Sequence, residues 1–438
     1  MTLTTPITVV RGRFLDIQKT VSQAQDIIDQ VRYIEDGVLI AKQGQIRWFG
    51  SWDDAQAHLP ANVEIQHYPE QLIIPGMIDT HIHFPQTEMV GAYGEQLLSW
   101  LNTYTFPTEI QFKEKAYAQQ IAKLFVNELL KNGTTTALVF CTVHPESVDA
   151  LFEAAAQQQM RLIAGKVMMD RHAPEALCDT AESAYEDSKA LIGKWHGQGR
   201  ALYAITPRFA PTSTPEQLER AGQLKAEFPD VYVHTHLSEN KDEIAWGKDL
   251  FPAQKGYLDV YHHYGLTGNR SVFAHCVHLE DAEWQCMHET DSAIAFCPTS
   301  NLFLGSGLFP LKKTWQQQVK VGLGTDIGAG TSFSLLQTVN EAYKVQQLQG
   351  DKLSAFESLY HATLGGAKAL DLDNKLGNFN VGKEADFVVL NLKPTALQQL
   401  RQSRAKSLED SLFALFTMGD DRNIEATYIY GQKAYSQS

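Results

Sequence analysis

Two histidines, His81 and His83, lie two positions apart in the segment PGMIDTHIHFPQ, where an apolar run ends just before Pro85. In a β-strand, residues i and i+2 point to the same face, so the two imidazoles would project together. An imidazole pair at this spacing suits zinc or iron, but His-x-His also occurs by chance at the end of an ordinary strand. The pair by itself therefore leaves both interpretations open.

Three further side chains that can bind metals occur later in the chain: His236 in VHTHLSE, His275 in VFAHCVHL and Asp326 in GLGTDIG. Each lies at or near the end of a segment with the pattern of a strand. Imidazole and carboxylate ligands without thiolates favour zinc or iron over copper(I) or a structural zinc–sulfur site. With histidines and an aspartate around the ion, one coordination position can stay open for water.

Glu239 follows His236 by three residues, which brings its carboxylate around the strand-to-helix turn toward such a site. A carboxylate beside a metal-activated water usually moves protons, and we favour this role over that of a carboxylate stabilised by a helix dipole. His234 shares a strand face with His236, and we expect it in a deeper layer of the fold. We expect surface, loop or helix-start positions for the others, namely His144, His262, His263 and His278.

The elements that must position these residues follow a regular order from residue 71 onward. Short apolar or β-branched runs alternate with segments of helical period, which is the pattern of βα units. Eight such units indicate a TIM-like (β/α)8 barrel, although periodicity alone leaves an open doubly wound sheet possible. In a barrel the active site forms at the carboxyl ends of the strands, where the polar residues above fall. The eight candidate strands span residues 72–83, 134–140, 161–169, 201–209, 231–239, 271–279, 293–300 and 320–328.

Two of the helical segments carry clear boundary signals. The segment 113–133 repeats apolar residues three or four apart and ends at Asn132-Gly133, a typical helix stop. In the segment 213–228, Thr214 is the expected N-cap, Pro215 occupies the first helical position and Gln217 would complete a capping box.

The two ends of the chain contain short strands and turns instead of βα units. Neither end is large enough to bury much core alone, so we expect them to pair into one small β-sandwich domain beside the barrel. The predicted division assigns residues 1–70 and 380–438 to this composite β domain and residues 71–379 to the barrel.

The composition is that of a soluble globular protein, and 37 basic against 51 acidic residues give a net charge of −14. This charge disfavours nucleic acid as a partner and is compatible with a small neutral substrate. The chain shows no secretory signal and no apolar run of membrane-spanning length, so we expect a cytoplasmic protein. Its five cysteines are scattered and never spaced as Cys-x-x-Cys, which indicates buried thiols in a reducing compartment. They are Cys141, Cys178, Cys276, Cys286 and Cys297.

Several quoted segments together resemble a known family. PGMIDTHIHFPQ, HTHLSE, AHCVHL, CPTSNLFLGSGLFPL and GLGTDIGAGTSFSLL are similar to the amidohydrolase superfamily of metal-dependent hydrolases, and within it to the guanine deaminases. The resemblance extends from VVRGRFLDI to GKEADFVVLNL. The similarity to guanine deaminases depends chiefly on HFPQTEMVGAYGEQLLSWLNTYTFPTE and TPRFAPT.

The resemblance implies a mononuclear site with one Zn²⁺ per subunit, Fe²⁺ being the alternative. The implied metal ligands are His81, His83, His236 and Asp326, and the implied catalytic residues are Glu239, His275 and Asp326. Whether His275 contacts the ion or only its water stays open. The implied contacts to a purine come from His83, Gln86, Arg208, Phe209, His236 and Asp326.

The chemistry of three of these side chains agrees with purine binding. The Gln86 amide can donate and accept at a base edge, Arg208 can donate to a carbonyl oxygen or ring nitrogen, and Phe209 offers stacking area. A structural salt bridge is the alternative for Arg208. Lys166, in RLIAGKVMMD, keeps a two-metal site with a carbamylated lysine open.

The implied activity is hydrolytic deamination of guanine to xanthine and ammonia in purine catabolism, by a homodimer as the family suggests. In this scheme Asp326 accepts a proton from the water, Glu239 delivers protons to the ring and the amine, and His275 orients the attacking oxygen. One alternative is another amidohydrolase that acts on a different aminopurine, an aminotriazine or a cyclic amide. The other is a metal-binding barrel without turnover, which Glu239 and Asp326 disfavour.

A second class of zinc deaminase, with His-x-Glu and Pro-Cys-x-x-Cys, does not fit. His278-Leu279-Glu280 matches its first half, but no Pro-Cys-x-x-Cys follows and eight βα units exceed that smaller fold.

Overall fold

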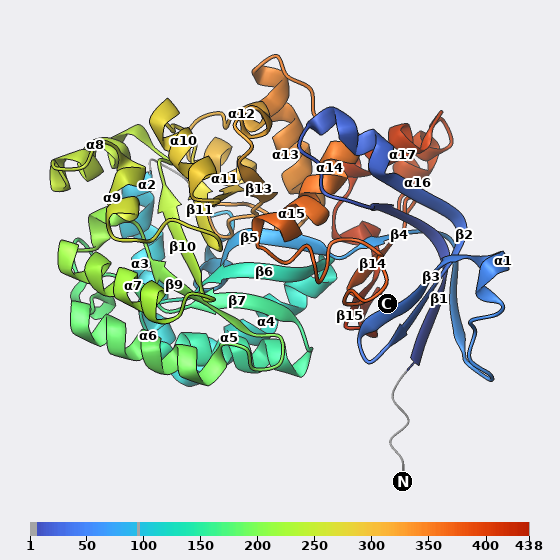
Figure 1. The fold of residues 1–438 in the computed structure, drawn as a ribbon, viewed down its shortest axis with the longest axis horizontal. Helices are drawn as coiled ribbons and strands as arrows, with labels where there is room; N and C mark the ends of the chain where they lie inside the picture. The colour runs from blue at the N-terminus through green and yellow to red at the C-terminus, as the bar shows by residue number, and fades with distance from the viewer. Residues whose placement is uncertain (1–6, 94–96, 438) are drawn as a thin grey trace, which may run out of the picture.

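The structure is a computed structural model that describes residues 7–93 and 97–437. Residues 1–6 of the predicted β domain and residues 94–96 of the quoted motif lie outside this description. Figure 1 shows a barrel surrounded by helices and, beside it, a separate sheet built from both ends of the chain. No helix among the described residues is long and apolar enough to cross a lipid bilayer.

The barrel consists of parallel strands in sequential order, and all eight predicted strands are confirmed. A short strand, β8 (Val167–Met168), pairs with β9 in addition. The TIM-like barrel is therefore correct and the open doubly wound sheet is excluded. The strands are β5 (Met77–His83), β6 (Thr134–Phe140), β7 (Arg161–Gly165), β9 (Leu202–Pro207), β10 (Tyr232–Leu237), β11 (Ser271–His275), β12 (Ala293–Phe296) and β13 (Lys320–Leu323).

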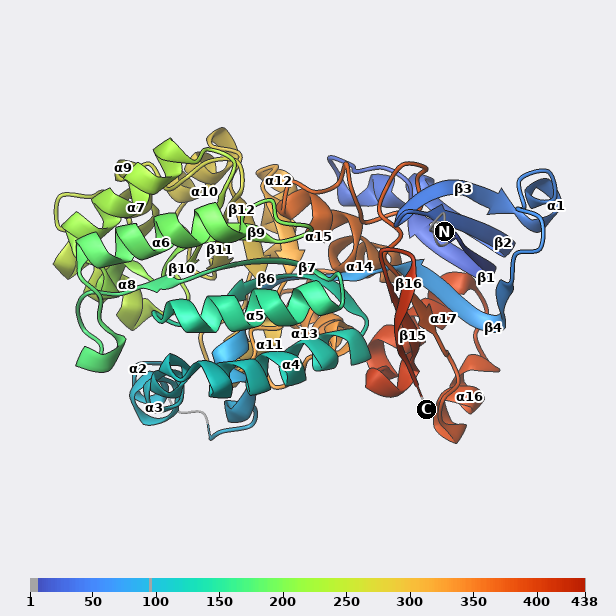
Figure 2. The ribbon, with the colours of Figure 1, turned by 90° about the horizontal axis from the view of Figure 1, so that it is seen from below.

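Helices cover the outside of the barrel (Figure 2), and their buried residues follow the helical period seen in the sequence. The principal ones are α4 (Lys115–Lys131), α5 (Pro145–Gln157), α6 (Ala181–Trp195), α7 (Pro215–Glu227), α8 (Lys241–Leu250), α9 (Tyr257–His263), α10 (Asp281–Glu289), α11 (Pro298–Phe303), α12 (Leu311–Gln316), α13 (Leu335–Leu348), α14 (Ala355–Ala362) and α15 (Leu364–Ala369). Between β5 and α4 lie the short helices η2 (Phe84–Met89), α2 (Leu97–Trp100), α3 (Phe106–Glu109) and η4 (Ile110–Lys113), with the π-helical turn η3 (Leu101–Thr105).

The helix boundaries are largely as predicted. Helix α4 ends at Asn132-Gly133, and Gly133 adopts a φ of +77°, a conformation that favours glycine. Thr214 caps α7 by accepting from the backbone N–H of Gln217 at 3.2 Å. The capping box is wrong, however, because the Gln217 side-chain oxygen instead accepts from the hydroxyl of Ser213.

The second sheet has the strand order β16-β15-β14-β4-β1-β2-β3, so it joins both ends of the chain. The sheet encloses its own apolar core, in which Phe14 contacts Phe49 and Phe379 with ring centroids 5.2 and 5.3 Å apart. The separate β unit from the two termini is thus confirmed. Its strands are β1 (Ile7–Ile17), β2 (Val31–Lys42), β3 (Gln45–Ser51), β4 (Ile65–Pro75), β14 (Phe387–Leu390), β15 (Ile424–Ile429) and β16 (Gln432–Ser436), with the short helices η1 (Ala24–Gln30) and α1 (Trp52–Ala55).

The chain passes from this sheet into the barrel at Gly76. The expected first barrel strand began at residue 72, but residues 72–75 belong to β4 and the barrel strand starts at Met77. A Cβ atom on Gly76 would lie 2.0 Å from the hydroxyl oxygen of Thr135, so only glycine fits at this crossing.

Two helices, α16 (Ala396–Gln402) and α17 (Leu408–Met418), separate β14 from β15. Helix α17 packs against the barrel helix α13, where the rings of Tyr343 and Phe413 lie 4.9 Å apart. The predicted division, residues 1–70 with 380–438 and residues 71–379, needs its boundaries moved, because residues 72–75 belong to β4 and Phe379 packs in the core of the second sheet. We propose that the barrel domain begins after Gly76 and ends before Phe379, with α17 as a contact between the two parts.

Buried charges also connect the two parts. Arg161 begins barrel strand β7, and its Nε donates to Glu384 Oε2 at 3.1 Å; Arg200 Nη2 donates to the same oxygen at 2.6 Å. Arg200 Nη1 also donates to Asp386 Oδ1 at 3.1 Å. These four side chains are at most 13% exposed, so the charges neutralise one another away from water.

Replacing Glu384 with alanine leaves two buried guanidinium groups with one carboxylate. Because loss of one partner strands a buried charge, we expect the free energy of unfolding to fall by about 3 kcal/mol, measured by urea denaturation. The control is Glu341→Ala, which breaks a surface ion pair with Lys344 and is expected to change the free energy by less than about 1 kcal/mol. Equal losses in the two variants would contradict this interpretation.

Candidate metal centre and active site

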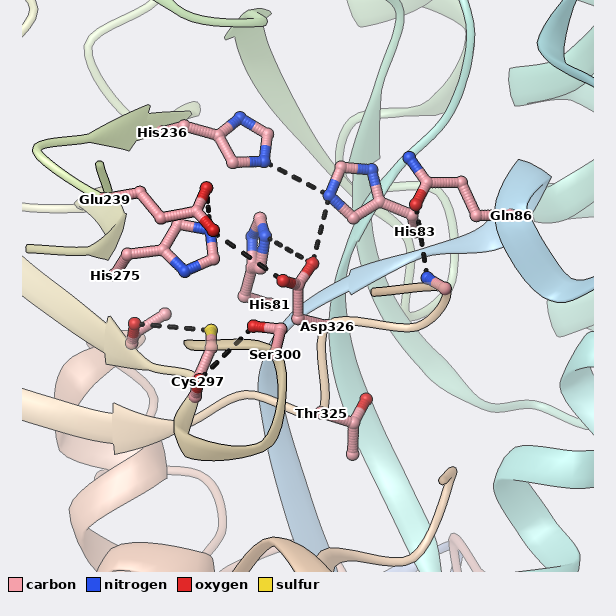
Figure 3. A network of polar contacts seen from close by, with 12 residues as sticks. His81, His83, Gln86, His236, Glu239, His275, Cys297, Ser300, Thr325 and Asp326 are labelled. Atoms are coloured by element: carbon pink, nitrogen blue, oxygen red, sulfur yellow. Dashed lines mark hydrogen bonds and ion pairs between the residues drawn. The ribbon is translucent and has the colours of Figure 1, made fainter. Parts of the chain in front are cut away.

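The five predicted metal-type residues meet at the carboxyl end of the barrel (Figure 3). His81 and His83 lie on β5, His236 on β10 and His275 on β11, while Asp326 follows β13. His81, His83, His275 and Asp326 are buried, and His236 is partly exposed. The expectation that strand ends bring them together is correct, because each residue is one of the last residues of its strand or lies in the loop directly after it.

The spacing of the donor atoms matches a small tetrahedral ion. His83 Nε2 lies 3.2 Å from His236 Nε2, and Asp326 Oδ1 lies 3.1 Å from His81 Nε2 and 3.3 Å from His83 Nε2. Ligands at the usual zinc distances of about 2.0–2.1 Å are about 3.3 Å apart in a tetrahedron. These three separations are therefore close to those that the ligands of one such ion take.

The protonation states also suit a cation. Burial lowers the pKa of His81, of His236 and of His83, the last to about 3, so that all three imidazoles are neutral. His236 Nδ1 donates to the carbonyl oxygen of Arg208 at 2.7 Å, which leaves the lone pair on Nε2, toward the other donors. His81 Nε2 is buried near Asp326 but makes no aligned hydrogen bond with a described residue. These lone pairs and the carboxylate fit a divalent ion.

Asp326 owes its position to a constrained backbone. Its φ is +52° and that of His275 is +73°, a region that non-glycine residues occupy at an energetic cost, mostly at functional sites. The Asp326 N–H donates to the His81 carbonyl oxygen at 2.9 Å. Burial opposes ionisation of Asp326, but the imidazoles of His81 and His83 lower its pKa, so it is a carboxylate at neutral pH.

Glu239 extends from the turn between β10 and α8 into the same site. Its Oε2 lies 3.4 Å from His275 Nε2, and its Oε1 accepts from the Ser306 hydroxyl at 3.0 Å. Burial and the charge of Asp326 raise the pKa of Glu239 to about 8, which the Ser306 hydrogen bond opposes, so the side chain holds a proton at neutral pH. Glu239 is not the residue that caps α8. The N-cap of this helix is Asn240, with Glu243 as its capping-box partner.

His275 lies between the two carboxylates. Its Nδ1 is 2.9 Å from the side-chain oxygen of Asn301, which holds the ring, and its Nε2 is 3.8 Å from Asp326 Oδ2. The ring can thus act on a group placed between Glu239 and Asp326.

A cavity opens directly onto these residues and is also lined by the three expected substrate contacts, Gln86, Arg208 and Phe209. Its other walls include Trp100, Leu101, Leu304 and Ala329. Apolar walls with a few converging polar groups are typical of a site for a small planar ligand.

Glu109 is a residue that the sequence reasoning missed. This fully buried carboxylate accepts from Arg208 Nη1 at 2.7 Å and from Gln86 Nε2 at 3.2 Å, and thereby holds both expected substrate contacts. Gln86 Oε1 also accepts from the backbone N–H of Gly328 at 3.2 Å. The salt bridge considered as an alternative for Arg208 is present, and Arg208 lines the cavity as well. The sequence did contain a signal for Glu109: it is the last residue of TFPTE, which ends the motif that resembles the guanine deaminases.

The other histidines and the lysine considered in the sequence do not line the cavity. Lys166 is buried in an ion pair with Asp179, and this leaves the two-metal alternative without support. His278 Nε2 lies 2.8 Å from the Ser306 carbonyl oxygen, and His262 and His263 are exposed at the end of α9. His144 is the residue before the first turn of α5, as expected.

The chain is similar to known proteins in sequence and in fold. The profile of the Amidohydrolase family matches residues 72–434. The chain is 61% identical to guanine deaminase from Escherichia coli strain K12 over 429 residues, 98% of each chain. A solved structure of E. coli guanine deaminase matches with a TM-score of 0.96 and 59% identity over 99% of this chain and 100% of that one. A guanine deaminase from C. acetobutylicum with bound guanine in its active site matches with a TM-score of 0.88 and 30% identity, over 98% of this chain and 100% of that one.

Replacing His83 with asparagine should abolish tight metal binding, since one of the clustered imidazole donors is lost. Changes to second-sphere partners already weaken metal affinity about 10–100-fold, so we expect more than about 100-fold here. Zinc affinity is measured by competition with a chromophoric chelator. His263→Asn removes an exposed imidazole of α9 and should bind zinc as the unaltered protein does. Unchanged affinity in the His83 variant would contradict the assignment of the cluster.

Proposed function

The chain belongs to the amidohydrolase family, and from this premise we propose that it is a metal-dependent hydrolase that converts guanine and water to xanthine and ammonia. The observation that carries the proposal is the shared cavity. The cavity is lined by His83, His236, His275 and Asp326 of the metal-type cluster, by the protonated acid Glu239, and by the pair Arg208 and Gln86. A small purine is therefore the substrate, and purine catabolism the setting of the reaction.

We propose one Zn²⁺ ion per subunit, held by His81, His83, His236 and Asp326, with Fe²⁺ as the alternative that shares these ligands. When bound, the ion supplies Lewis acidity that lowers the pKa of a water molecule toward neutrality. The support is the donor spacing near 3.2 Å and the unpaired His81 Nε2.

The residues of the chain supply the proton transfers. Asp326 is ionised and accepts a proton as the water becomes a nucleophile, and His275, 3.8 Å from it, orients the attacking oxygen. A bond forms between this oxygen and C2 of guanine. Glu239, protonated at neutral pH, gives its proton to the adjacent ring nitrogen. Glu239 then takes the remaining proton of the attacking oxygen and passes it to the exocyclic amine. The C2–N bond breaks as the C2 carbonyl forms, so that ammonia leaves and xanthine remains, and the proton held by Asp326 returns to Glu239.

The hydrogen-bonding groups of the cavity favour guanine over adenine. Arg208 has only donors, which suits the carbonyl oxygen of guanine and offers nothing to the exocyclic amine that adenine carries in the same place. Glu109 keeps the Arg208 guanidinium and the Gln86 amide in fixed orientations, and Phe209 packs against Trp246 with ring centroids 6.0 Å apart. Since buried polar groups left unpaired by a wrong base cost binding energy, this arrangement selects its substrate.

The setting of the enzyme is part of the same proposal. All five cysteines lie in the described part of the chain and are free thiols, which agrees with the cytoplasm. A homodimer is proposed from the family resemblance.

The function is tested with metal-quantified protein and guanine, adenine or cytosine as substrates. Guanine should release ammonia and give the absorbance of xanthine, whereas the other two bases should release none. Release from adenine or cytosine but not from guanine would contradict the proposal. In the same assay Glu239→Gln should retain zinc and lose at least about 100-fold in kcat, because general acid–base catalysis contributes about 10²–10⁴-fold. Glu283→Gln, a buried carboxylate of α10 outside the site, is the control.

The pH profile should respond to Ser306. If Glu239 must carry a proton, kcat/KM falls as the pH rises through its pKa, about 8. The Ser306 hydroxyl donates to Glu239 and so stabilises its ionised form, which means that Ser306→Ala raises the pKa and moves the alkaline limb to higher pH. Ser300→Ala, whose hydroxyl instead donates to the Cys297 carbonyl oxygen, should leave the limb in place. An alkaline limb that stays put or moves to lower pH in Ser306→Ala would refute the role of Glu239 as the acid.

A further inference from the structure

His234 is a polar residue in a layer of the barrel where apolar side chains are usual. It precedes His236 by two residues on β10, is fully buried, and its Nε2 lies 2.8 Å from His81 Nδ1. The two rings are nearly perpendicular, with an interplanar angle of 85° and centroids 4.9 Å apart. Barrel interiors are filled mainly by Val, Ile and Leu, so a buried imidazole that spans from β10 to β5 calls for a reason.

The outer nitrogens of the three clustered imidazoles have different partners. His236 Nδ1 donates to the Arg208 carbonyl oxygen at 2.7 Å, and His83 Nδ1 has no hydrogen-bond partner among the described residues. Within the described part of the chain, the hydrogen-bond partner of His81 Nδ1 is the imidazole of His234. A histidine that binds a metal through Nε2 keeps its proton on Nδ1, and the partner of that N–H fixes both tautomer and ring orientation.

We propose that His234 is a positioning residue for the metal ligand His81. His234 Nε2 accepts the Nδ1 proton of His81, and the His81 Nε2 lone pair is thereby presented to the zinc ion. This inference rests on the metal site proposed above and adds a residue that lies outside the cavity lining. Glu239, Asp326 and the other lining residues keep the roles given to them.

The proposed hydrogen bond determines the tautomer of His234 as well. Because its Nε2 is an acceptor, its own proton must be on Nδ1, and Nδ1 has no hydrogen-bond partner among the described residues. The ring instead packs against Phe140, with centroids 4.4 Å apart. A buried donor without a partner reduces stability, so a branched apolar side chain would serve the fold better at this position. Retention of an imidazole there is explained by what it does for His81.

A neutral acceptor also suits the charge of the site. Asp326 and Asp79 already place carboxyl groups within hydrogen-bond range of the His81 side chain and backbone. A carboxylate at position 234 would bury another negative charge, whereas the imidazole of His234 orients the His81 ring without adding a charge.

The test compares His234→Leu, which removes the acceptor, with His234→Gln, whose side-chain oxygen can accept from His81 Nδ1. Zinc affinity, measured by chelator competition, should fall about 10–100-fold in the leucine variant and return to within about threefold of the unaltered protein in the glutamine variant. Thermal unfolding of the metal-free leucine variant should occur at no lower temperature than that of the unaltered protein. His361→Leu, which removes another buried imidazole without hydrogen-bond partners, should leave zinc affinity unchanged.

Wild-type zinc affinity in His234→Leu, or a loss of metal-free stability without a loss of affinity, would overturn the inference. Histidine ¹⁵N NMR of the zinc-loaded protein gives a second measurement that needs no variant: His81 and His234 should both carry the proton on Nδ1, and a His234 proton on Nε2 would refute the hydrogen bond. If the unaltered protein bound no zinc, the proposed metal site itself would fail. Normal zinc binding that is insensitive to His234 would remove this inference alone.

Discussion

The barrel closes between β5 and β13, and the geometry of the site depends on how this closure is made. Polar contacts join the two strands: the Thr80 hydroxyl donates to the Leu323 carbonyl oxygen at 2.9 Å, and the Asp79 carboxylate accepts from the N–H groups of His81 and Thr325, both at 3.1 Å. Burial raises the pKa of Asp79 to about 7 against these hydrogen bonds. The proposed metal ligands His81 and Asp326 lie on opposite sides of this closure, so the same contacts set the distance between them.

Burial then gives each group its chemical state. On the surface, clustered histidines would titrate near neutral pH and repel a cation, but here loss of solvent keeps the imidazoles neutral with their lone pairs available. The same loss of solvent raises the pKa of Glu239 to about 8 and keeps it protonated beside an ionised Asp326. Two carboxyl groups on either side of His275 thus take the roles of acid and base because their surroundings move their pKa values in opposite directions.

Most of the barrel and the cluster could be predicted because both depend on local patterns. The strands have short β-branched runs, and a residue at the end of a barrel strand points toward the mouth wherever that strand lies in the chain. The partners of buried side chains could not be predicted in this way. Glu109 precedes Arg208 by 99 residues, and the contact of His234 with His81 joins residues 153 apart, so only the packed barrel shows them. The start of β5 and the use of Gln217 were wrong for a related reason, since residues 72–75 pair with β14, far along the chain, and Ser213 donates to the Gln217 side chain.

Several features of the site lower the free energy of unfolding, and a bound metal ion would compensate for this loss of stability. Asp326 and His275 hold left-handed backbone conformations, and His81 Nε2 and His83 Nδ1 are buried without hydrogen bonds to described residues. Each feature opposes folding by an amount that apolar packing in the barrel must offset. An ion bound to these donors engages the His81 lone pair and binds only the folded chain, so its binding free energy adds to stability. The clustered donor atoms, which reduce the stability of the metal-free protein, are thus the groups through which a divalent cation would stabilise the fold.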